Sequence, residues 1–476
     1  MTFLKKLLTP ILLLLIIIMP FTGISAKDIK EKNSGGENIF KNQELLNSVF
    51  NKLYNLEKNK EGKVNIVHIG DSHIQADFFT NAIREVMQNQ FGNGGFGFTF
   101  PYSLVRTNGP RYIRYNCNAT WESLMNVSPV RDVGVGLSGI ALYTSAQDFI
   151  LQLSANDGFE FNTVKIIYPT EEAHYKMSVN APQLEASAGS TRGGATATGI
   201  KYHKIKSGES LSSIARKYRV TVAQIKKANN MRSNTIHPNK SLKIPVKTAA
   251  KPIVKPTNVK VNDSTDLVDI VFKPYYSSYT SDSTLSRITI LPDGKTAMYN
   301  LNGFVVENDQ PGVIYHSIGV NGAKMTDYNK YPLFFKQLPI LEPDLIILSF
   351  GTNESFGKIS DTEYIYQLKE FTNNIKVLNP NAVILVMTPP PSMFRRRRPN
   401  TFIVDYTTAL MTLNDMPVWD LFTRMGGAAG IGPRGEYAGM IARDKVHYTV
   451  SGYQAQGSLF VSDFMSAYNY FKKQKH

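Results

Sequence analysis

The chain reads Val64-Asn65-Ile66-Val67-His68-Ile69-Gly70-Asp71-Ser72-His73, an apolar run that passes directly into a turn of small and polar residues. Such a run predicts a buried strand of the parallel kind. A turn at the carboxyl end of a parallel strand faces the crevice where α/β sheets bind ligands. The pattern therefore makes the hydroxyl group of Ser72 a candidate nucleophile.

A block near the C-terminus supplies the groups that a serine nucleophile needs. Asp444-Lys445-Val446-His447 offers an imidazole to take the hydroxyl proton and a carboxylate to orient that imidazole. Read singly, each residue has a plainer interpretation, Ser72 as turn chemistry and Asp444 with His447 as a surface ion pair. Their joint occurrence at the ends of predicted strands favours the catalytic interpretation.

Further apolar runs predict the rest of a parallel sheet and its helices. The strands are expected at residues 312–318, 344–350 and 382–387, and helices at residues 362–378 and 451–472. We therefore expect one α/β domain assembled from residues 40–110 and 312–472 and split by an insertion.

Four sequence blocks stand in order around these predicted strands. Gly70-Asp71-Ser72-His73 is followed by Gly319-Val320-Asn321-Gly322-Ala323, by Gly351-Thr352-Asn353-Glu354 and by the block that ends at His447. These blocks resemble those of the SGNH (GDSL-type) hydrolases. The resemblance implies a flavodoxin-like three-layer core with a parallel sheet and a serine-dependent carboxylic ester hydrolase.

The resemblance also implies a role for each matching residue. Ser72 is the nucleophile, His447 is the general base, and Asp444 orients the imidazole. The backbone N–H groups of Ser72 and Gly322 and the side-chain amide of Asn353 form the oxyanion hole. Gly319, in the same loop as Gly322, is the alternative for the glycine.

Two other motif readings fit the sequence less well. Asp71-Ser72-His73 is also an Asp-x-His, the first block of metallophosphoesterases, but the Gly-Asp-x-x-Asp and Gly-Asn-His blocks do not follow it. Gly92-Asn93-Gly94-Gly95-Phe96-Gly97 spells a dinucleotide fingerprint but follows a helix-like segment, so we interpret it as a glycine-rich loop near the active site. Cys117 is the single cysteine, which excludes a multi-cysteine metal site. We expect no metal and no cofactor.

The N-terminus has the pattern of a secretory signal. Lys5-Lys6 precedes an apolar run at residues 11–19, and Gly23-Ile24-Ser25-Ala26 has the small residues of a cleavage site. An uncleaved membrane anchor is the alternative, although the run is well short of about 20 apolar residues. We expect residues 1–26 to be a signal peptide. The protein would then be exported, periplasmic or associated with the cell wall, with no membrane insertion after cleavage.

A small basic unit lies in the middle of the chain between two stretches of linker composition. Residues 186–199 are rich in Ser, Ala, Thr and Gly, and residues 246–260 in Lys, Pro, Ala and Val. Residues 201–245 hold eleven Lys or Arg and one acid, so this unit carries +10 of the formal charge of +15 of the whole chain. Such a unit attracts polyanions, and outside the cytoplasm these are wall or surface polymers. No nucleic-acid recognition motif accompanies the charge.

The pattern of the basic unit predicts the order β-α-α-β, with strands at residues 201–206 and 241–244, a first helix at residues 209–218 and a second helix opened by the capping box at residues 221–224. Tyr202-His203-Lys204-Ile205-Lys206-Ser207-Gly208-Glu209-Ser210-Leu211 and Ile236-His237-Pro238-Asn239-Lys240-Ser241-Leu242-Lys243-Ile244-Pro245 resemble a LysM domain. LysM domains bind glycans that carry N-acetylglucosamine, so the resemblance implies a wall-binding module. The contacts that it implies are Gly208, Ser210, Leu211, Ile236, His237 and Pro238. A basic helical hairpin without a ligand is the alternative.

The segments on either side of this unit have short alternating runs and frequent turns, a pattern typical of a β-sandwich. We expect one β domain, residues 111–183 and 262–311, that is inserted in the hydrolase core and itself interrupted by the LysM unit. A core with such an insertion resembles the peptidoglycan O-acetylesterases, in which a carbohydrate-binding-like sandwich occupies that position. The LysM unit is a departure from that pattern.

This second resemblance implies removal of acetyl groups from the C6 hydroxyl of N-acetylmuramoyl residues, with peptidoglycan or a related acetylated glycan as the partner. Several alternatives use the same blocks. An esterase or O-acetyltransferase could act on another acetylated surface polysaccharide. A lipase or lysophospholipase gains nothing obvious from a LysM unit, and a non-catalytic wall-binding protein would be expected to have decayed blocks.

Overall fold

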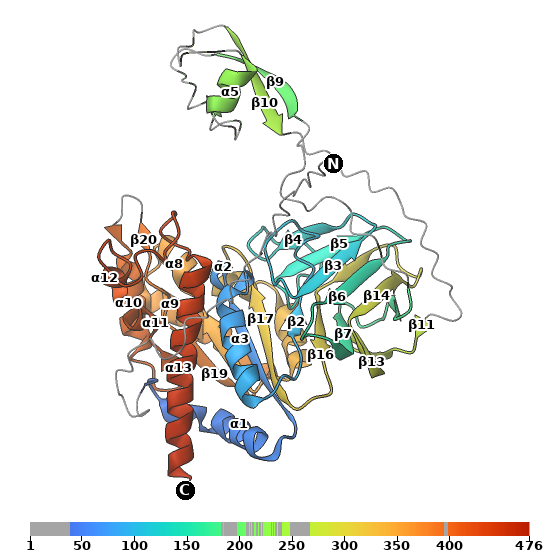
Figure 1. Ribbon diagram of the computed structural model, residues 1–476, viewed down its shortest axis with the longest axis vertical. Helices are drawn as coiled ribbons and strands as arrows, with labels where there is room; N and C mark the ends of the chain where they lie inside the picture. Colours follow the sequence, from blue (N-terminus) through green and yellow to red (C-terminus); the bar gives the residue numbers. More distant parts are fainter. Residues whose placement is uncertain are drawn as a thin grey trace, which may run out of the picture.

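The computed structural model describes residues 39–181, 184, 267–394 and 398–475, and, with gaps, residues 198–247 (Figure 1). The N-terminal residues 1–38, which include the predicted signal peptide, lie outside the described residues. Among the helices of the described ranges, none combines the length and the apolar character needed to cross a bilayer.

A parallel sheet of five strands forms the centre of the α/β domain predicted from residues 40–110 and 312–472, which we call the hydrolase part. Its spatial order is β17-β1-β18-β19-β22. The strands are β1 (Lys63–Gly70), β17 (Gly312–Gly319), β18 (Leu345–Ser349), β19 (Val383–Met387) and β22 (Val418–Trp419). The first strand of the chain therefore lies second in the sheet, and the order by sequence is 2-1-3-4-5. This is the flavodoxin-like order, so the predicted fold class is confirmed.

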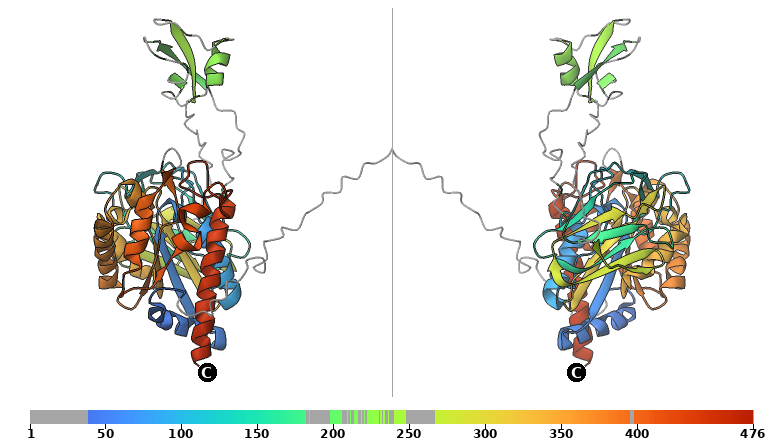
Figure 2. Two further views of the ribbon diagram at one scale, coloured as in Figure 1. Left: turned by 90° about the vertical axis from the view of Figure 1, so that its left-hand side faces the viewer. Right: turned by 90° about the vertical axis from the view of Figure 1, so that its right-hand side faces the viewer.

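The apolar strands feed two cores, one on each face of the sheet, because successive side chains of a strand point to opposite faces. In β1, Val64 and Ile66 belong to one core, whereas Val67 and Ile69 belong to the other. The first core is covered by α1 (Asn47–Asn59), α3 (Phe78–Phe91) and α13 (Val450–Gln474). The second is covered by α6 (Met325–Asn329), α7 (Pro332–Gln337), α9 (Asp361–Leu378) and α10 (Thr401–Leu410). The result is a three-layer arrangement (Figure 2).

Short elements complete the hydrolase part. They are η1 (Gln43–Leu46), α2 (Ser72–Gln75), η2 (Leu338–Leu341), α8 (Thr352–Phe356), β20 (Met393–Phe394), β21 (Arg398–Pro399), α11 (Leu421–Arg424) and α12 (Gly427–Gly430). The long C-terminal helix α13 packs closely on α3 at Gly457, where a Cβ atom would approach the Cβ of Ala82 to 2.6 Å. A glycine is needed here because the two helices touch.

The inserted β part consists of antiparallel sheets in the orders β11-β8-β14-β6-β3, β12-β13-β7-β16-β2 and β15-β5-β4. Their bounds are β2 (Gly97–Thr99), β3 (Ile113–Cys117), β4 (Glu122–Met125), β5 (Ile140–Thr144), β6 (Leu151–Ala155), β7 (Phe161–Ile167), β8 (Tyr175–Ser178), β11 (Leu267–Val268), β12 (Val271–Lys273), β13 (Tyr276–Leu285), β14 (Arg287–Pro292), β15 (Tyr299–Leu301) and β16 (Gly303–Glu307). Apolar residues of the two five-stranded sheets share one core, as in a sandwich. Strand β2 precedes the boundary predicted at residue 110 yet pairs with β16.

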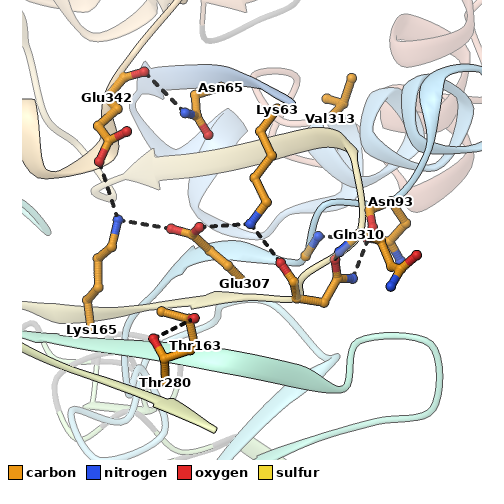
Figure 3. Close-up of polar contacts among 12 residues, drawn as sticks. Lys63, Asn65, Asn93, Thr163, Lys165, Thr280, Glu307, Gln310, Val313 and Glu342 are labelled. Carbon is orange, nitrogen blue, oxygen red and sulfur yellow. Dashed lines mark hydrogen bonds and ion pairs between the residues drawn. The ribbon is translucent and has the colours of Figure 1, made fainter. Parts of the chain in front are cut away.

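The β part and the hydrolase part are joined by apolar and by charged contacts. The core beneath β18 continues without interruption into the β sheets. At the edge of this core, Glu307 forms ion pairs with Lys63 of β1 at 3.2 Å and with Lys165 of β7 at 3.0 Å (Figure 3). Although burial alone would raise the pKa of Glu307, the two ammonium groups lower it below its usual value.

The glycine-rich segment at residues 92–97 does not lie near the active site, so that expectation was wrong. Asn93 bridges to Val313 at the start of β17, whereas the block that contains Ser72 lies beside the other end of that strand, where Gly70 pairs with Gly319. The reason is the length of α3. Its 14 residues span about 20 Å and return the chain to the amino end of the sheet.

The LysM-like unit has β9 (Thr198–Lys204) paired antiparallel with β10 (Ser241–Lys247), and the helix α5 (Val222–Ala228). The buried apolar residues of the unit form a core of their own, made of Ile205, Leu211, Ile214, Ala215, Ile225, Leu242 and Ile244. Both predicted strands and the second predicted helix are present. In the first predicted helix, Leu211, Ile214 and Ala215 are helical, whereas Glu209 and Tyr218 at its predicted ends are not.

Candidate active site

Ser72 lies where the sequence predicts it, at the carboxyl end of β1 and the start of α2. Gly70 permits this turn, because a Cβ atom there would approach Ile74 and the carbonyl oxygen of Ser349 to 2.6 Å. Asp71 caps α2 by accepting a hydrogen bond from the backbone N–H of His73 at 2.9 Å. The cap fixes the helix start and thereby the position of the Ser72 hydroxyl.

The structure brings Ser72, His447 and Asp444 into one hydrogen-bonded chain. Oγ of Ser72 is 2.8 Å from Nε2 of His447, and Nδ1 of His447 is 2.8 Å from Oδ2 of Asp444. The second oxygen of Asp444 accepts the backbone N–H groups of Val446 and His447, each at 3.0 Å. Partial burial alone would raise the pKa of Asp444, but these hydrogen bonds lower it below its usual value. The carboxylate is therefore ionised and oriented toward the imidazole.

The loop that carries Asp444 and His447 is anchored on both sides. Backbone hydrogen bonds join Ala442 to His447 at 2.7 Å and Met393 to Lys445 at 2.8 Å. Immediately after the loop, Thr449 caps α13 through the N–H of Gly452. The imidazole is thus presented by a closed turn at the start of a long helix, which limits its freedom to move away from Ser72.

Asn353 and the two candidate glycines have distinct surroundings. Asn353, in α8, donates its side-chain amide to Oδ2 of Asp71 at 3.1 Å and to the carbonyl of Ala323 at 2.9 Å. Gly322 is exposed, has φ +84°, and has no atom within 4 Å of the place where a Cβ would stand. At Gly319, by contrast, a Cβ would approach the backbone N of Gln75 to 2.4 Å, so this glycine allows β17 to pack against α2. The arrangement favours Gly322 over Gly319 as a backbone donor.

Two buried carboxyl groups beside these residues escaped the sequence analysis. Glu354 accepts the backbone N–H groups of Met325 at 3.0 Å and Gly351 at 2.9 Å, and so ties α8 to α6. Burial raises the pKa of Glu354 to about 6, and burial together with the nearby Glu354 raises the pKa of Asp71 to about 8. Both residues stand inside the quoted sequence blocks, but nothing in a block separates a buried acid from an exposed one.

His73 is a further residue whose place the sequence does not reveal. Its ring is buried, lies 5.4 Å from the ring of His447 between centroids, and shares a hydrogen bond with the hydroxyl of Tyr453 at 3.0 Å. Burial, with a smaller effect from His447, lowers the pKa of His73 to about 3. A neutral ring therefore packs against the imidazole of His447.

Of the predicted glycan contacts of the LysM-like unit, Leu211 and Ile236 are among the described residues. Gly208, Ser210, His237 and Pro238 lie outside the described residues. Leu211 is 3% exposed and its side chain belongs to the core of the unit, so its role as a glycan contact stays a prediction. Ile236 is partly buried against the same core. Within the described ranges, no three His, Cys, Asp or Glu side chains gather where they could hold a metal ion.

Comparison with known families identifies two segments of the chain. Residues 297–455 match the GDSL-like Lipase/Acylhydrolase family, and residues 203–245 match the LysM domain. The N-acetylmuramoyl-L-alanine amidase sle1 of Staphylococcus saprophyticus is 36% identical over 98 residues, which are 20% of this chain and 30% of the amidase. The chain thus covers less than a third of that relative.

Comparison with solved structures extends over most of the chain. A peptidoglycan O-acetylesterase is similar over 89% of this chain and 96% of its own, with a TM-score of 0.58 and 19% identity. A lipase/acylhydrolase from Enterococcus faecalis matches 32% of this chain and 76% of its own, with a TM-score of 0.26 and 23% identity. The first of these likenesses supports the fold of the hydrolase and β parts together. The protein contains a GDSL-like lipase/acylhydrolase domain together with a LysM domain.

Proposed function

We propose that the protein is a serine esterase that removes O-acetyl groups from cell-wall peptidoglycan. The observation that carries the proposal is the hydrogen-bonded chain from Ser72 through His447 to Asp444, with 2.8 Å at each step. A hydroxyl, an imidazole and an oriented carboxylate at these distances are what nucleophilic ester hydrolysis requires.

The first half of the reaction forms an acetyl-enzyme. Oγ of Ser72 attacks the acetyl carbonyl carbon while its proton passes to Nε2 of His447, and Asp444 stabilises the imidazolium. The tetrahedral oxyanion is held by neutral donors, for which we propose the N–H groups of Ser72 and Gly322 and the amide of Asn353. His447 then gives its proton to the sugar oxygen, which leaves as a hydroxyl group. Acetyl-Ser72 remains.

The second half returns the enzyme to its starting state. Water loses a proton to Nε2 of His447 and adds to the carbonyl carbon of acetyl-Ser72. The second oxyanion collapses, acetate leaves, and the proton on His447 returns to Oγ of Ser72. The ring of His73, which is hydrogen-bonded to Tyr453, packs beside the ring of His447, while Nε2 of His447 stays directed at Ser72.

The substrate is proposed from the additions to the hydrolase core. The solved structure that shares the fold over 89% of this chain is that of a peptidoglycan O-acetylesterase. The LysM domain and the amidase relative both favour a cell-wall glycan as the polymer that is bound. From the resemblance to the peptidoglycan O-acetylesterases, we propose the C6 acetyl ester of N-acetylmuramoyl residues as the bond cleaved.

The proposed location follows from the same features. The pattern of residues 1–26 supports export, and a basic LysM domain supports retention on an anionic wall polymer. We therefore propose that the exported enzyme works while associated with the cell wall.

The decisive experiment measures acetate released from O-acetylated peptidoglycan by the protein without residues 1–26. We expect steady release, and at least a 10³-fold lower rate in Ser72→Ala. Ser458→Ala is the matched control, since this serine is exposed on α13 and bonds only within its helix to Gln454. Adding a sugar acceptor separates hydrolysis from acyl transfer, because transfer would divert acetyl groups from acetate. Release that does not depend on Ser72 would overturn the proposal.

A further inference from the structure

Gln75 occupies a position three residues after the proposed nucleophile and is buried to 1% exposure. It is the last residue of α2, the short helix that begins at Ser72. The proposed mechanism gives it no role. A buried amide carries a cost unless its polar atoms are bonded, so its partners are informative.

The partners of Gln75 come from two distant segments. Its Oε1 accepts the backbone N–H of Asn321 at 2.7 Å. Its Nε2 donates to the carbonyl of Asn108 at 2.7 Å, and is within 2.9 Å of Oγ1 of Thr107 and 3.0 Å of Oδ1 of Asn108. One side chain therefore bridges the turn that holds Gly322 and the segment that leads from β2 into β3 of the inserted β part.

The bridge is closed by a third amide. The side-chain nitrogen of Asn321 donates to Oδ1 of Asn108 at 2.9 Å and to Oγ1 of Thr107 at 3.2 Å. Asn108 thus receives donors from both Gln75 and Asn321, while Gln75 receives the backbone of Asn321. Such a closed set of hydrogen bonds fixes the relative positions of its members better than one bond would.

The turn that this set holds is otherwise open. The N–H of Ala323 donates to the carbonyl of Val320 at 3.0 Å, and Gly322 has the positive φ of +84° that the third residue of a type II turn requires. The N–H of Gly322 is not used by the turn's own hydrogen bond. Because no atom packs within 4 Å of the Cβ position of Gly322, local packing does little to hold that N–H in place.

We propose that Gln75 is the positioning residue of the oxyanion hole, which sets the N–H of Gly322 against the acetyl oxygen on Ser72. It acts through Gly322 and touches no reacting atom. The proposal rests on the proposed esterase function of Ser72. In this arrangement, the first residue of α2 is the proposed nucleophile, Ser72, and its last residue, Gln75, sets the distance from Ser72 to one oxyanion donor.

The primary test replaces Gln75 by methionine, which keeps the length of the side chain and removes its hydrogen bonds. With p-nitrophenyl acetate as substrate, we expect kcat to fall about 10- to 100-fold and KM to change less than about threefold, because the lost donor geometry matters only when the oxyanion forms. The matched control is Gln88→Met. Gln88 is also buried but bonds Gly95 and Val313 at the amino end of β17, so kcat should stay within about twofold of wild type. An equal loss in both variants would show general packing and overturn the proposal.

A double variant separates positioning from structural support. Gly322→Ala places a Cβ on a residue with φ +84°, and we expect the backbone strain to shift the same N–H. If Gln75 acts through Gly322, adding Gln75→Met to Gly322→Ala lowers kcat by less than about threefold, whereas independent effects would multiply. If the loss of kcat in the double variant equals the product of the losses in the two single variants, the proposal is overturned.

The exposed Asn108 keeps the test open should Gln75→Met fail to fold. Asn108→Ala removes the side-chain oxygen that Gln75 and Asn321 share, while the carbonyl of residue 108 and Oγ1 of Thr107 remain as acceptors for Gln75. We expect this loosening to lower kcat about 3- to 10-fold with KM unchanged. An unchanged kcat in Asn108→Ala overturns the proposal in that case. Two failures are distinguishable: activity that Ser72→Ala abolishes but Gln75→Met leaves intact overturns this inference alone, whereas wild-type activity that Ser72→Ala does not lower overturns the esterase function as well.

Discussion

Asn353 donates its side-chain amide to Asp71 at 3.1 Å, so one amide joins the proposed oxyanion site to the residue that precedes the nucleophile. The same nitrogen donates to Ala323, which follows Gly322. Burial and the nearby Glu354 raise the pKa of Asp71 to about 8, so the carboxyl group of Asp71 is mainly uncharged near neutral pH. A fully charged oxyanion is a stronger acceptor than a neutral acid and would draw the amide to itself.

From this relationship we expect Asn353→Ala to lower kcat about 10²- to 10³-fold with little change in KM, because the donor is needed only when negative charge develops. Steady-state kinetics with p-nitrophenyl acetate measure both constants. Asn374→Ala on α9 is the control, since its amide bonds only Asn329, on α6. A rise in KM with kcat unchanged would instead mean that Asn353 binds the ground state.

The buried histidine in β1 predicts a dependence of stability on pH. His68 is 0% exposed, with Nδ1 2.8 Å from the hydroxyl of Tyr315 and Nε2 2.7 Å from Oγ of Ser349, and burial lowers its pKa to about 3. Between pH 3 and 6.5 the unfolded chain binds a proton here that the folded protein does not. The contribution of His68 to stability is therefore complete above about pH 6.5 and is lost as pH falls, by about 1.4 kcal/mol per pH unit.

The variant that isolates this effect is His68→Gln, which keeps a polar amide at this position and has no group that titrates in this pH range. We expect the free energy of unfolding, measured by urea titration between pH 4 and 6, to depend on pH less steeply in the variant by about 1.4 kcal/mol per unit. Comparing slopes removes the constant cost of the substitution itself. Equal slopes in the two proteins would mean that His68 is protonated in the folded state.

A buried ion pair between Arg84 of α3 and Asp77, the residue before that helix, leads us to expect a large loss of stability when the pair is broken. Arg84 makes two hydrogen bonds of 2.9 Å to the carboxylate of Asp77, and both side chains are at most 1% exposed. The guanidinium also lies 4.3 Å from the centroid of the Phe96 ring. We expect Arg84→Met to lower the free energy of unfolding by about 3–5 kcal/mol, because Asp77 is left buried without a counter-charge.

The second variant of this pair checks the cause. Asp77 has φ +59°, a conformation that asparagine also tolerates, so Asp77→Asn introduces no new strain. Urea unfolding of the double variant Arg84→Met with Asp77→Asn should recover at least a third of the loss, since no unpaired charge remains. A double variant as unstable as Arg84→Met alone would assign the loss to packing against Phe96.

The features that could be predicted from the sequence are those that depend on a few adjacent residues. The turn at Ser72 after β1, the block at Asp444 and the buried parallel strands are local patterns, and the structure has the turn, the hydrogen-bonded pair of Asp444 and His447 and the strands at these places. The catalytic roles of these residues stay a prediction. Strand β22 was not, because its two residues are too short for any periodicity. The glycine-rich loop at residues 92–97 was misplaced because its distance from the nucleophile depends on the whole length of α3.

The supporting shell of the site could not be predicted for a different reason. Gln75 and Asn321 are 246 residues apart, and Asp71 and Asn353 are 282 apart. An isolated glutamine or aspartate has no pattern that indicates a buried partner so distant in the chain. Only the closure of the sheet brings these segments together, so their contacts became visible with the fold.

The LysM domain supplies the last prediction. The side chain of Asn229, at the end of α5, accepts the N–H of Lys243 at 2.8 Å and donates to its carbonyl at 2.7 Å, and it also donates to Ile225 at 2.8 Å. It thus pairs with β10 as a neighbouring strand would. Because the core of this domain is small, losing these bonds removes a large share of its stability.

We therefore expect Asn229→Ala to weaken binding to insoluble peptidoglycan at least about tenfold, measured by sedimentation, as the domain loses its fold. Turnover of p-nitrophenyl acetate should change less than about twofold, because the domain has a core separate from that of the hydrolase part. Ser241→Ala, exposed at the start of β10, is the control and should keep both properties. If Asn229→Ala loses wall binding and ester turnover together, the LysM domain supports the hydrolase fold. If the variant keeps its wall binding, the glycan contacts lie outside the LysM domain.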